Sequence, residues 1–455
     1  MSVDVIAELR EPMPHASRES GAGHTKGSWC GSEEHGVGRR GFLAAAGLGA
    51  AAFAANMRVL DVLQSPIFAD EIKRQEKRVI LLWLAGGASQ LETWDPKPGR
   101  PTGGPFAAID TNVPGIRISE LMPKLAQRQQ HTAIVRSLNT RNADHGGGTT
   151  LMETGRATEP GLIFPDLGAV LARELGRPDS PVPDYVSMYT STEGRHKGGP
   201  GFLGSRYAPM FLDNGLMPDN IRRLEAITDL DHKERGDLRG VLNARFSRGR
   251  ENASLGSHNG AYQRVRGLMS SEKLFDIEQE PQAMRDLYGP TQFGEQTLVA
   301  RRLIEAGTPF VKVARAWWDS HGQNFETHLE LVADLDNVMS ALLDDLQNRG
   351  LLERTLVITV GEFGRTPQIN PSLGRDHFAS AWSASLSGCG IKGGTVYGAT
   401  DEDGNTVKDG EVNAGDFFAT IFTALGINPH KEYYVGARPV PLTDAKSKAI
   451  SSVLA

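Results

Sequence analysis

The chain of 455 residues is long enough for one large α/β domain or two smaller ones. Its hydrophobic content of 39% and charged content of 23% are typical of a globular protein. The net charge of −6 shows no basic excess, so we expect no nucleic-acid partner.

The chain begins with a polar segment over residues 1–38, rich in Gly, Ser, Glu and His, which we expect to be a disordered leader. Arg39 and Arg40 follow, ahead of a weakly hydrophobic, uncharged segment over residues 41–55. An arginine pair in this position is typical of a twin-arginine export signal. The small-x-small pattern of a cleavage site occurs at Ala52-Phe53-Ala54 and, less clearly, at Ile67-Phe68-Ala69.

Residues 39–69 are therefore predicted to be a twin-arginine signal and linker, which would direct the protein to the periplasm or outside the cell. The alternative is an amphipathic or buried helix that follows a chance arginine pair. The apolar run is shorter than the roughly 20 residues of a membrane-spanning helix. We therefore expect no stable membrane span in the mature chain.

Beyond this segment, short apolar runs alternate with helical patterns, which is typical of a parallel α/β sheet. The run over residues 79–84 is continuous, as in a strand buried on both faces. Strand-length runs also occupy residues 132–135, 310–314 and 356–360. Amphipathic spacing predicts a helix over residues 326–349, which would join the last two strands in a βαβ unit, and a second helix over 416–425.

These elements predict an α/β domain over residues 77–450, with a central, mostly parallel sheet flanked by helices. Residues 185–290 are rich in Gly, Pro, Arg and Ser and contain no obvious buried strand. We expect them to form a cap-like insertion over the sheet.

Polar clusters follow each of the four predicted strands. Because the carboxyl ends of parallel strands meet at one edge of a sheet, these side chains are expected to share one crevice. Each residue alone has an ordinary alternative, such as a helix N-cap, a strand-end ion pair or a loop hydrogen bond, and only the joint placement favours a site. The candidate residues are Glu92, Asp95, His145, Asp319, His321, Glu362, Asp376 and His377.

A metal site here would use oxygen and nitrogen ligands. Cys30 lies in the predicted leader, so the mature chain keeps only Cys389 and a thiolate cluster is excluded. Carboxylates and imidazoles without thiolates suit a divalent metal, Zn²⁺, Mn²⁺, Mg²⁺ or Ca²⁺, at one or two sites.

Several motifs resemble one family in order along the chain. They are Gly86-Gly-Ala-Ser-Gln-Leu-Glu-Thr-Trp-Asp-Pro-Lys-Pro98, Trp318-Asp-Ser-His-Gly-Gln-Asn-Phe325, Gly361-Glu-Phe-Gly-Arg-Thr-Pro367 and Gly374-Arg-Asp-His377. From about residue 40 onward the chain resembles the domain-of-unknown-function family numbered 1501, which is common in planctomycetes and often carries twin-arginine signals. That family is similar to the alkaline phosphatase and sulfatase superfamily. The resemblance implies a mostly parallel sheet with a one-metal or two-metal hydrolytic site at its edge.

The same resemblance suggests metal ligands. Asp319 and His321 match the superfamily's aspartate and histidine ligands, with His328 as a substitute for the second. Glu362 would replace an aspartate ligand, and His377 resembles a late histidine ligand. The chain departs from the pattern at two places: Phe363 stands where a histidine ligand is expected, and Gly86-Gly87 where an acid pair is expected. Glu92 or Asp95 would have to compensate for that acid pair.

The nucleophile position also departs from the superfamily. Thr154-Gly155-Arg156 resembles the end of the sulfatase nucleophile segment, and counting back places His145 at the nucleophile position. A histidine can act as a nucleophile in phosphoryl transfer. Thr149 or Thr150, one helical turn on, are the alternatives, and Arg365 or Arg375 would clamp the anion.

Two functions are compatible with these features. The first is an exported, metal-dependent hydrolase of phosphate or sulfate esters, acting on an anionic small molecule or a sulfated or phosphorylated polymer. The second is a catalytically degenerate relative that binds an anionic ligand or a cell-envelope partner without turnover. The retained acids and histidines favour the first, and the missing ligands and nucleophile favour the second.

Overall fold

The computed structural model describes the chain from residue 76 to residue 455 with several gaps. The described residues are 76–177, 180–189, 198–212, 215–219, 221, 226–248, 262, 265, 267–269 and 271–455. The expected leader at 1–38 and the expected signal at 39–69 lie outside them.

A central sheet organises the fold. Eight strands lie in the order β12-β4-β11-β8-β1-β7-β5-β6. Every neighbouring pair is parallel except the two pairs that β11 makes, with β4 and with β8. The predicted α/β class with a mostly parallel sheet is therefore confirmed. The strands are β1 (Arg78–Leu84), β4 (Thr132–Leu138), β5 (Tyr185–Tyr189), β6 (Met210–Leu212), β7 (Phe310–Arg315), β8 (Thr355–Val360), β11 (Trp382–Gly388) and β12 (Thr395–Tyr397).

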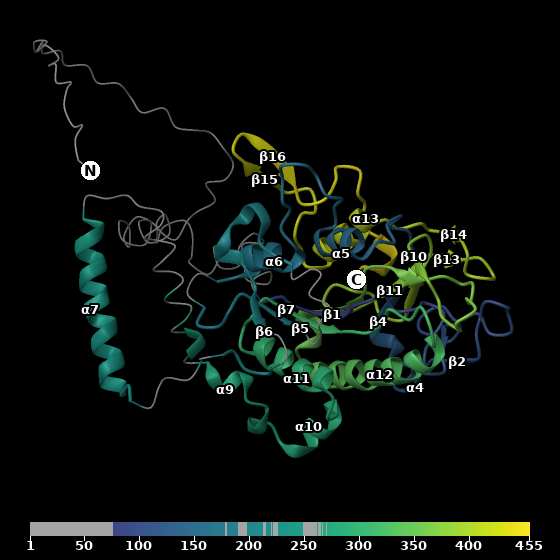
Figure 1. Ribbon diagram of the computed structural model, residues 1–455, viewed down its shortest axis with the longest axis horizontal. Coiled ribbons are helices and arrows are strands. Elements are labelled where there is room, and N and C mark those ends of the chain that lie inside the picture. The colour runs from purple at the N-terminus through teal and green to yellow at the C-terminus, as the bar shows by residue number, and fades with distance from the viewer. Residues whose placement is uncertain are drawn as a thin grey trace, which may run out of the picture. The chain divides into compact units, whose positions relative to one another are not determined.

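Helices cover both faces of this sheet (Figure 1). All seven residues of β1 are buried, and its alternate side chains enter two different cores. Val79, Leu81 and Trp83 pack with residues of α5 (His145–Thr154), α6 (Leu167–Leu175) and α13 (Ala414–Ala424). Ile80, Leu82 and Leu84 pack with residues of α11 (Gln292–Glu305) and α12 (Asn324–Asn348). The result is a three-layer α/β/α arrangement.

The predicted helix over 326–349 corresponds to α12, whose apolar stripe is buried against the sheet. Four shorter or peripheral helices are α4 (Pro123–Ala126), α7 (Asp229–Ser247), α9 (Glu272–Phe275) and α10 (Gln282–Tyr288). Four two-stranded pairs complete the strands: β2 (Ala108–Asp110) with β3 (Arg117–Ser119), β9 (Gly364–Arg365) with β10 (His377–Phe378), β13 (Ala399–Thr400) with β14 (Val407–Asp409), and β15 (Glu432–Val435) with β16 (Arg438–Pro441).

One sequence expectation needs correction. We expected no buried strand within residues 185–290, but β5 and β6 belong to the central sheet, and Val186 and Met188 on β5 are fully buried. These strands are short and mixed in composition, so they lack the long apolar run that marks β1. The insertion boundaries themselves remain a prediction. Among the described residues, no helix has the length and hydrophobicity needed to cross a bilayer.

Candidate metal centre

The carboxyl ends of parallel strands deliver the polar clusters to one place. His145 begins α5, seven residues after β4 ends, and Asp319 follows β7 by four residues. Glu362 follows β8 by two residues, and His377 lies in β10, where it pairs with Arg365 of β9. Since β4, β7 and β8 run in the same direction, their ends share one edge of the sheet.

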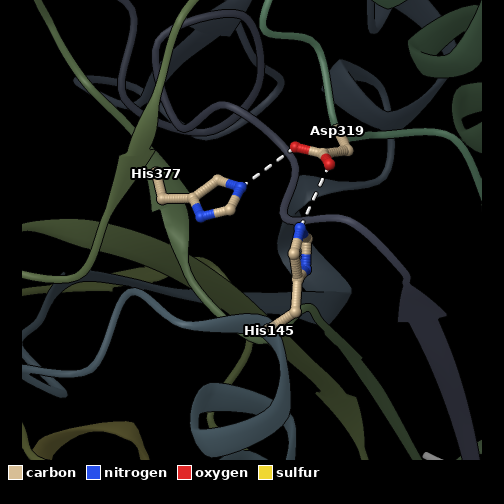
Figure 2. A group of neighbouring side chains, drawn as sticks. All are labelled: His145, Asp319 and His377. Atoms are coloured by element: carbon tan, nitrogen blue, oxygen red, sulfur yellow. Dashed lines mark hydrogen bonds and ion pairs between the residues drawn. The ribbon is translucent and has the colours of Figure 1, made fainter. Parts of the chain in front are cut away.

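Asp319 is at the centre of the cluster. Its Oδ2 atom lies 3.1 Å from Nε2 of His145, and its Oδ1 atom lies 3.1 Å from Nε2 of His377 (Figure 2). Nε2 of His321 is also 3.1 Å from Oδ1. One ligand atom each of His145, Asp319 and His377 lie within 4.8 Å of one another, so these three side chains could hold a metal ion.

Each of the three imidazoles is held from its outer side. In His145, Nδ1 lies 2.9 Å from Oε1 of Glu362. In His321, Nδ1 lies 2.7 Å from Oδ1 of Asp376, and in His377 it lies 2.8 Å from the Ala143 carbonyl oxygen. A carbonyl or carboxylate oxygen accepts a hydrogen bond, so the Nδ1–H groups donate outward. In its neutral form each ring then presents the lone pair of Nε2 toward Asp319, as metal-binding histidines do.

Two observations fit a cation at this centre. The Nε2 atoms of His321 and His377 face each other at 3.0 Å, an arrangement that requires a proton or a cation between them when both Nδ1 atoms carry hydrogen. In addition, Oε2 of Glu362 is buried and has no hydrogen-bond partner among the described residues. The donor set of imidazole nitrogen and carboxylate oxygen therefore fits a divalent metal.

The protonation states follow from these contacts. Burial opposes the charge on Asp319, but hydrogen bonds from His145, His377 and Arg365 outweigh it and hold the pKa of this carboxyl well below its ordinary value. Hydrogen bonds to Asp319 and Glu362 raise the pKa of His145 to about 9. Without a metal, His145 is an imidazolium between two carboxylates.

The role of Arg365 differs from our expectation of an anion clamp. Its side chain is fully buried and donates to the carbonyl oxygens of Gly86, Gly87 and Arg375 as well as to Oδ1 of Asp319 at 2.7 Å. The guanidinium thus fixes Asp319 and the loop after β1, and it does not reach an anion in the crevice.

The structure also corrects the assignment of Glu92 as a metal ligand, together with that of Arg375 as an anion clamp. Glu92 forms a fully buried ion pair with Arg375, with a shortest distance of 2.7 Å. The remaining donors of Arg375 bond to carbonyl oxygens of Thr102, Thr366 and Pro367. This pair ties the loop after β1 to the loop between β9 and β10.

Asp95 is likewise not at the centre. Its carboxylate accepts from Lys97 at 3.0 Å and from the Thr400 hydroxyl at 2.5 Å, so both oxygens are used elsewhere.

His328 cannot substitute for His321, because both of its ring nitrogens are engaged. Nδ1 donates to the Asn324 carbonyl and Nε2 accepts from the Ser89 amide, each at 2.9 Å. Complete burial lowers its pKa to about 4, so this histidine is neutral and structural.

The expected nucleophiles, His145, Thr149 and Thr150, lie in the first two turns of α5. Both ring nitrogens of His145 are committed to Glu362 and Asp319, and His145 is one of the three residues that could hold a metal ion. Thr150 donates its hydroxyl to the Gly146 carbonyl at 2.8 Å. Thr149 is buried one helical turn beyond His145.

Of the two departures from the expected pattern, the one at Gly86-Gly87 has a steric reason. Gly86 and Gly87 have φ values of +107° and +85°, and a Cβ atom at Gly86 would lie 2.5 Å from the Asp319 backbone nitrogen. No acid side chain fits there, and the Gly86 amide instead donates to Glu362 at 2.9 Å. The buried Phe363 ring packs 4.3 Å from the His377 ring and 5.1 Å from the His145 ring, as an apolar floor.

Sequence reasoning found Asp376 but not its task of holding His321, and it missed the Ala143 carbonyl that holds His377. The signal for the first was the repeated pairing of an acid and a histidine within two residues, at Asp319 and His321 and at Asp376 and His377. A backbone carbonyl leaves no signal in the sequence.

The family model described as "Protein of unknown function (DUF1501)" matches residues 76–454, which is most of the chain. The chain therefore belongs to this family, as its motifs predicted. Among curated proteins, none is significantly similar in sequence.

Solved structures similar to this chain include members of the alkaline phosphatase and sulfatase superfamily. The lipoteichoic acid synthase LtaP from Listeria monocytogenes is 9% identical over 78% of this chain and 72% of that one, with a TM-score of 0.37. The PsFucS1 sulfatase from Pseudoalteromonas sp. is 12% identical over 79% and 71%, with a TM-score of 0.36. Alkaline phosphatase from the Antarctic bacterium TAB5 is 12% identical over 77% and 98%, also with a TM-score of 0.36. Such identities transfer no activity, so the chain's own residues decide what it can do.

Proposed function

We propose that this DUF1501 protein is a metal-dependent hydrolase of phosphate or sulfate esters. The observation that carries the proposal is the arrangement around Asp319. Three imidazoles are each held through Nδ1 by an outer acceptor, and their Nε2 atoms converge on the same carboxylate. Holding three rings in fixed orientations costs side-chain entropy, which the binding of a metal ion would offset.

His145, Asp319 and His377 would hold the metal ion. Of the ions considered, Zn²⁺ suits a set of imidazole nitrogens with one carboxylate oxygen best. The metal would polarise an ester oxygen and stabilise the negative charge that develops on it.

The residues of the chain would supply the remaining steps. Arg365 keeps Asp319 ionised and oriented. His321 is about half exposed, is paired with Asp376 through Nδ1 and presents Nε2 to Oδ1 of Asp319 at 3.1 Å, so it would be a further ligand on the solvent side of the metal. Phe363 excludes water beneath the rings.

The alternative is a protein that binds an anionic ligand without turnover. One observation favours it: Arg365 and Arg375 are fully buried and bonded within the protein, and His145 has no free ring nitrogen. His145 therefore does not supply a nucleophile, and Arg365 and Arg375 do not supply an anion clamp.

The test compares the wild-type protein with Asp319→Asn and His377→Ala, and with Asp110→Asn as a control on an exposed acid of β2. Metal content and hydrolysis of 4-nitrophenyl phosphate and 4-nitrophenyl sulfate are measured on each. We expect the wild type and the control to bind metal and to hydrolyse one of the esters, and the two site variants to lose both. A wild type without metal contradicts the metal proposal, and a metal-loaded wild type that binds phosphate or sulfate without turnover supports the alternative.

We further propose that the protein acts in the periplasm or outside the cell, supported by Arg39 and Arg40 ahead of an uncharged apolar segment. Replacing both arginines by lysine should leave the protein in the cytoplasm. Unchanged export of that variant would count against the twin-arginine route.

A further inference from the structure

The backbone around the metal centre is unusual among the described residues. The non-glycine residues with φ in the left-handed region are Arg141, Trp317, Gln323 and Leu373, with values from +52° to +75°. All four lie on the loops that carry His145, Asp319, His321, Asp376 and His377. Such conformations cost about 1–3 kcal/mol each, and they tend to gather at ligand-binding sites.

Trp317 is the most costly of these residues, because a bulky side chain at a φ of +75° is a genuine outlier. The residue is 57% exposed, so burial does not offset the strain. Its neighbour Trp318 is fully buried and packs against His328, with ring centroids 5.4 Å apart. The loop therefore places one tryptophan in the core and holds the other at the surface.

The position of Trp317 relates it to the metal centre. It precedes Asp319 by two residues, which span at most about 7 Å of chain. Leu373, also 57% exposed and left-handed, precedes Asp376 by three residues on a loop that bonds to the same segment, since the Asn324 amide donates to the Leu373 carbonyl. Two exposed apolar residues thus lie within three residues of Asp319 and Asp376 along the chain, next to a centre suited to an anionic group.

We propose that Trp317 is a stacking platform for a sugar ring, so that the substrate is a carbohydrate that carries the phosphate or sulfate ester. This inference rests on the proposed function and names its substrate class. The metal centre would bind only the anionic group of the substrate. The exposed aromatic face of Trp317 offers a second contact for the rest of the substrate. A pyranose has an apolar C–H face and a polar rim, which suits contact with one aromatic face while its hydroxyls stay in water.

An acyl chain is a poorer fit, because it needs an enclosed apolar groove. One cavity in the described part of the chain, of about 910 Å³, is lined by residues between Gly215 and Leu298, and a smaller one is lined by residues of α5, α6, α13 and the C-terminal strands. Neither lining includes Asp319, His321, Asp376 or His377.

The test measures binding of glucose 6-phosphate and glucosamine 6-sulfate against ethyl phosphate and ethyl sulfate, which carry the same anions without a ring. The full-length wild type is compared with Trp317→Ala and Trp317→Phe, with and without EDTA. Tyr434→Ala is the matched control, because Tyr434 is a 62% exposed aromatic on β15. We expect Trp317→Ala to weaken binding of one of the sugar esters by about five- to tenfold and Trp317→Phe by less, with ethyl ester binding unchanged. The Tyr434 variant should bind like the wild type.

A structural role for Trp317 makes a different prediction, so thermal unfolding is measured on Trp317→Gly. Glycine adopts this φ freely, and we expect the melting temperature to stay the same or rise. A lowered melting temperature, equal losses for sugar and ethyl esters, or a wild type that binds ethyl esters but no sugar ester would overturn the stacking role and leave the proposed hydrolase standing. A wild type without metal would count against the proposed hydrolase. In that case the binding measured in EDTA still compares Trp317→Ala with the wild type and so still tests the stacking role.

Discussion

The Nδ1 atom of His145 lies 2.9 Å from Oε1 of Glu362, whose second carboxylate oxygen is buried without a hydrogen-bond partner in the described part of the chain. Glu362 therefore sets the orientation of the imidazole whose Nε2 faces Asp319 at 3.1 Å. Glu362 is thus the outer partner of His145 in this structure, and its role as a direct metal ligand, expected from the sequence, stays a prediction.

Replacing Glu362 by Gln tests this relationship. The amide keeps the shape of the side chain but removes the charge that orients and polarises His145. We expect metal affinity to fall about 10- to 100-fold, as for other outer-shell partners of metal-binding histidines. Metal titration measures the change. Glu353→Gln is the control, since Glu353 is exposed at the opposite end of β8, and equal affinities in the two variants would contradict the assignment.

Metal affinity should depend on pH through His145. In the metal-free protein its pKa is raised to about 9, and the metal must displace the proton from Nε2. Apparent affinity should therefore rise as pH rises, by about tenfold per unit between roughly pH 7 and 9, and level off above that pKa. Titrations at several pH values measure the slope. In Glu362→Gln the plateau should begin at a lower pH, and a flat profile in the wild type would exclude His145 as a ligand.

The buried pair of Glu92 and Arg375 should matter for stability and not for metal binding. Glu92→Gln leaves the guanidinium buried without its counter-charge, which typically costs about 3–5 kcal/mol in the free energy of unfolding. Urea unfolding measures the loss, and the metal content of the folded fraction should equal that of the wild type. Glu402→Gln, on the exposed partner of Arg100, should leave the unfolding midpoint unchanged. A stable Glu92→Gln protein that had lost its metal would restore Glu92 as a ligand.

Gly87 and Gly99 form a matched pair for the loop after β1, with φ values of +85° and +79°. Alanine at Gly99 meets no atom within 4 Å, so it should cost only the left-handed backbone penalty of about 1–2 kcal/mol. Alanine at Gly87 would bring Cβ to 2.7 Å from Phe363 and should cost about 1–3 kcal/mol more. Chemical denaturation compares the two. We also expect weaker metal binding in Gly87→Ala alone, and equal effects of the two substitutions would show that the loop tolerates the added atom.

The fold was predictable where burial leaves a long apolar pattern. β1 is buried on both faces and has a continuous apolar run over residues 79–84. β7 and β8 are buried and mostly apolar, with Lys312 inside β7, and α12 shows its buried stripe at helical spacing. β11 lies between β4 and β8, but its sequence WSASLSG contains small polar residues and lacks the apolar run that predicts a buried strand. Its place depends on neighbours distant in the sequence.

The sequence by itself determined the α/β class, the family, and the set of acids and histidines at strand ends, because strand burial and loop position leave a local pattern. Only the tertiary structure decided the task of each side chain. It separated His145, Asp319 and His377, which face one another, from Glu92 and Asp95, which have buried partners of their own. It also placed Arg365 beneath Asp319 and left Trp317 exposed beside it. The physical reason is that a carboxylate, an imidazole or an aromatic ring has the same composition in every role. Its partners come from residues far away along the chain, such as Thr400 for Asp95 at a separation of 305 residues.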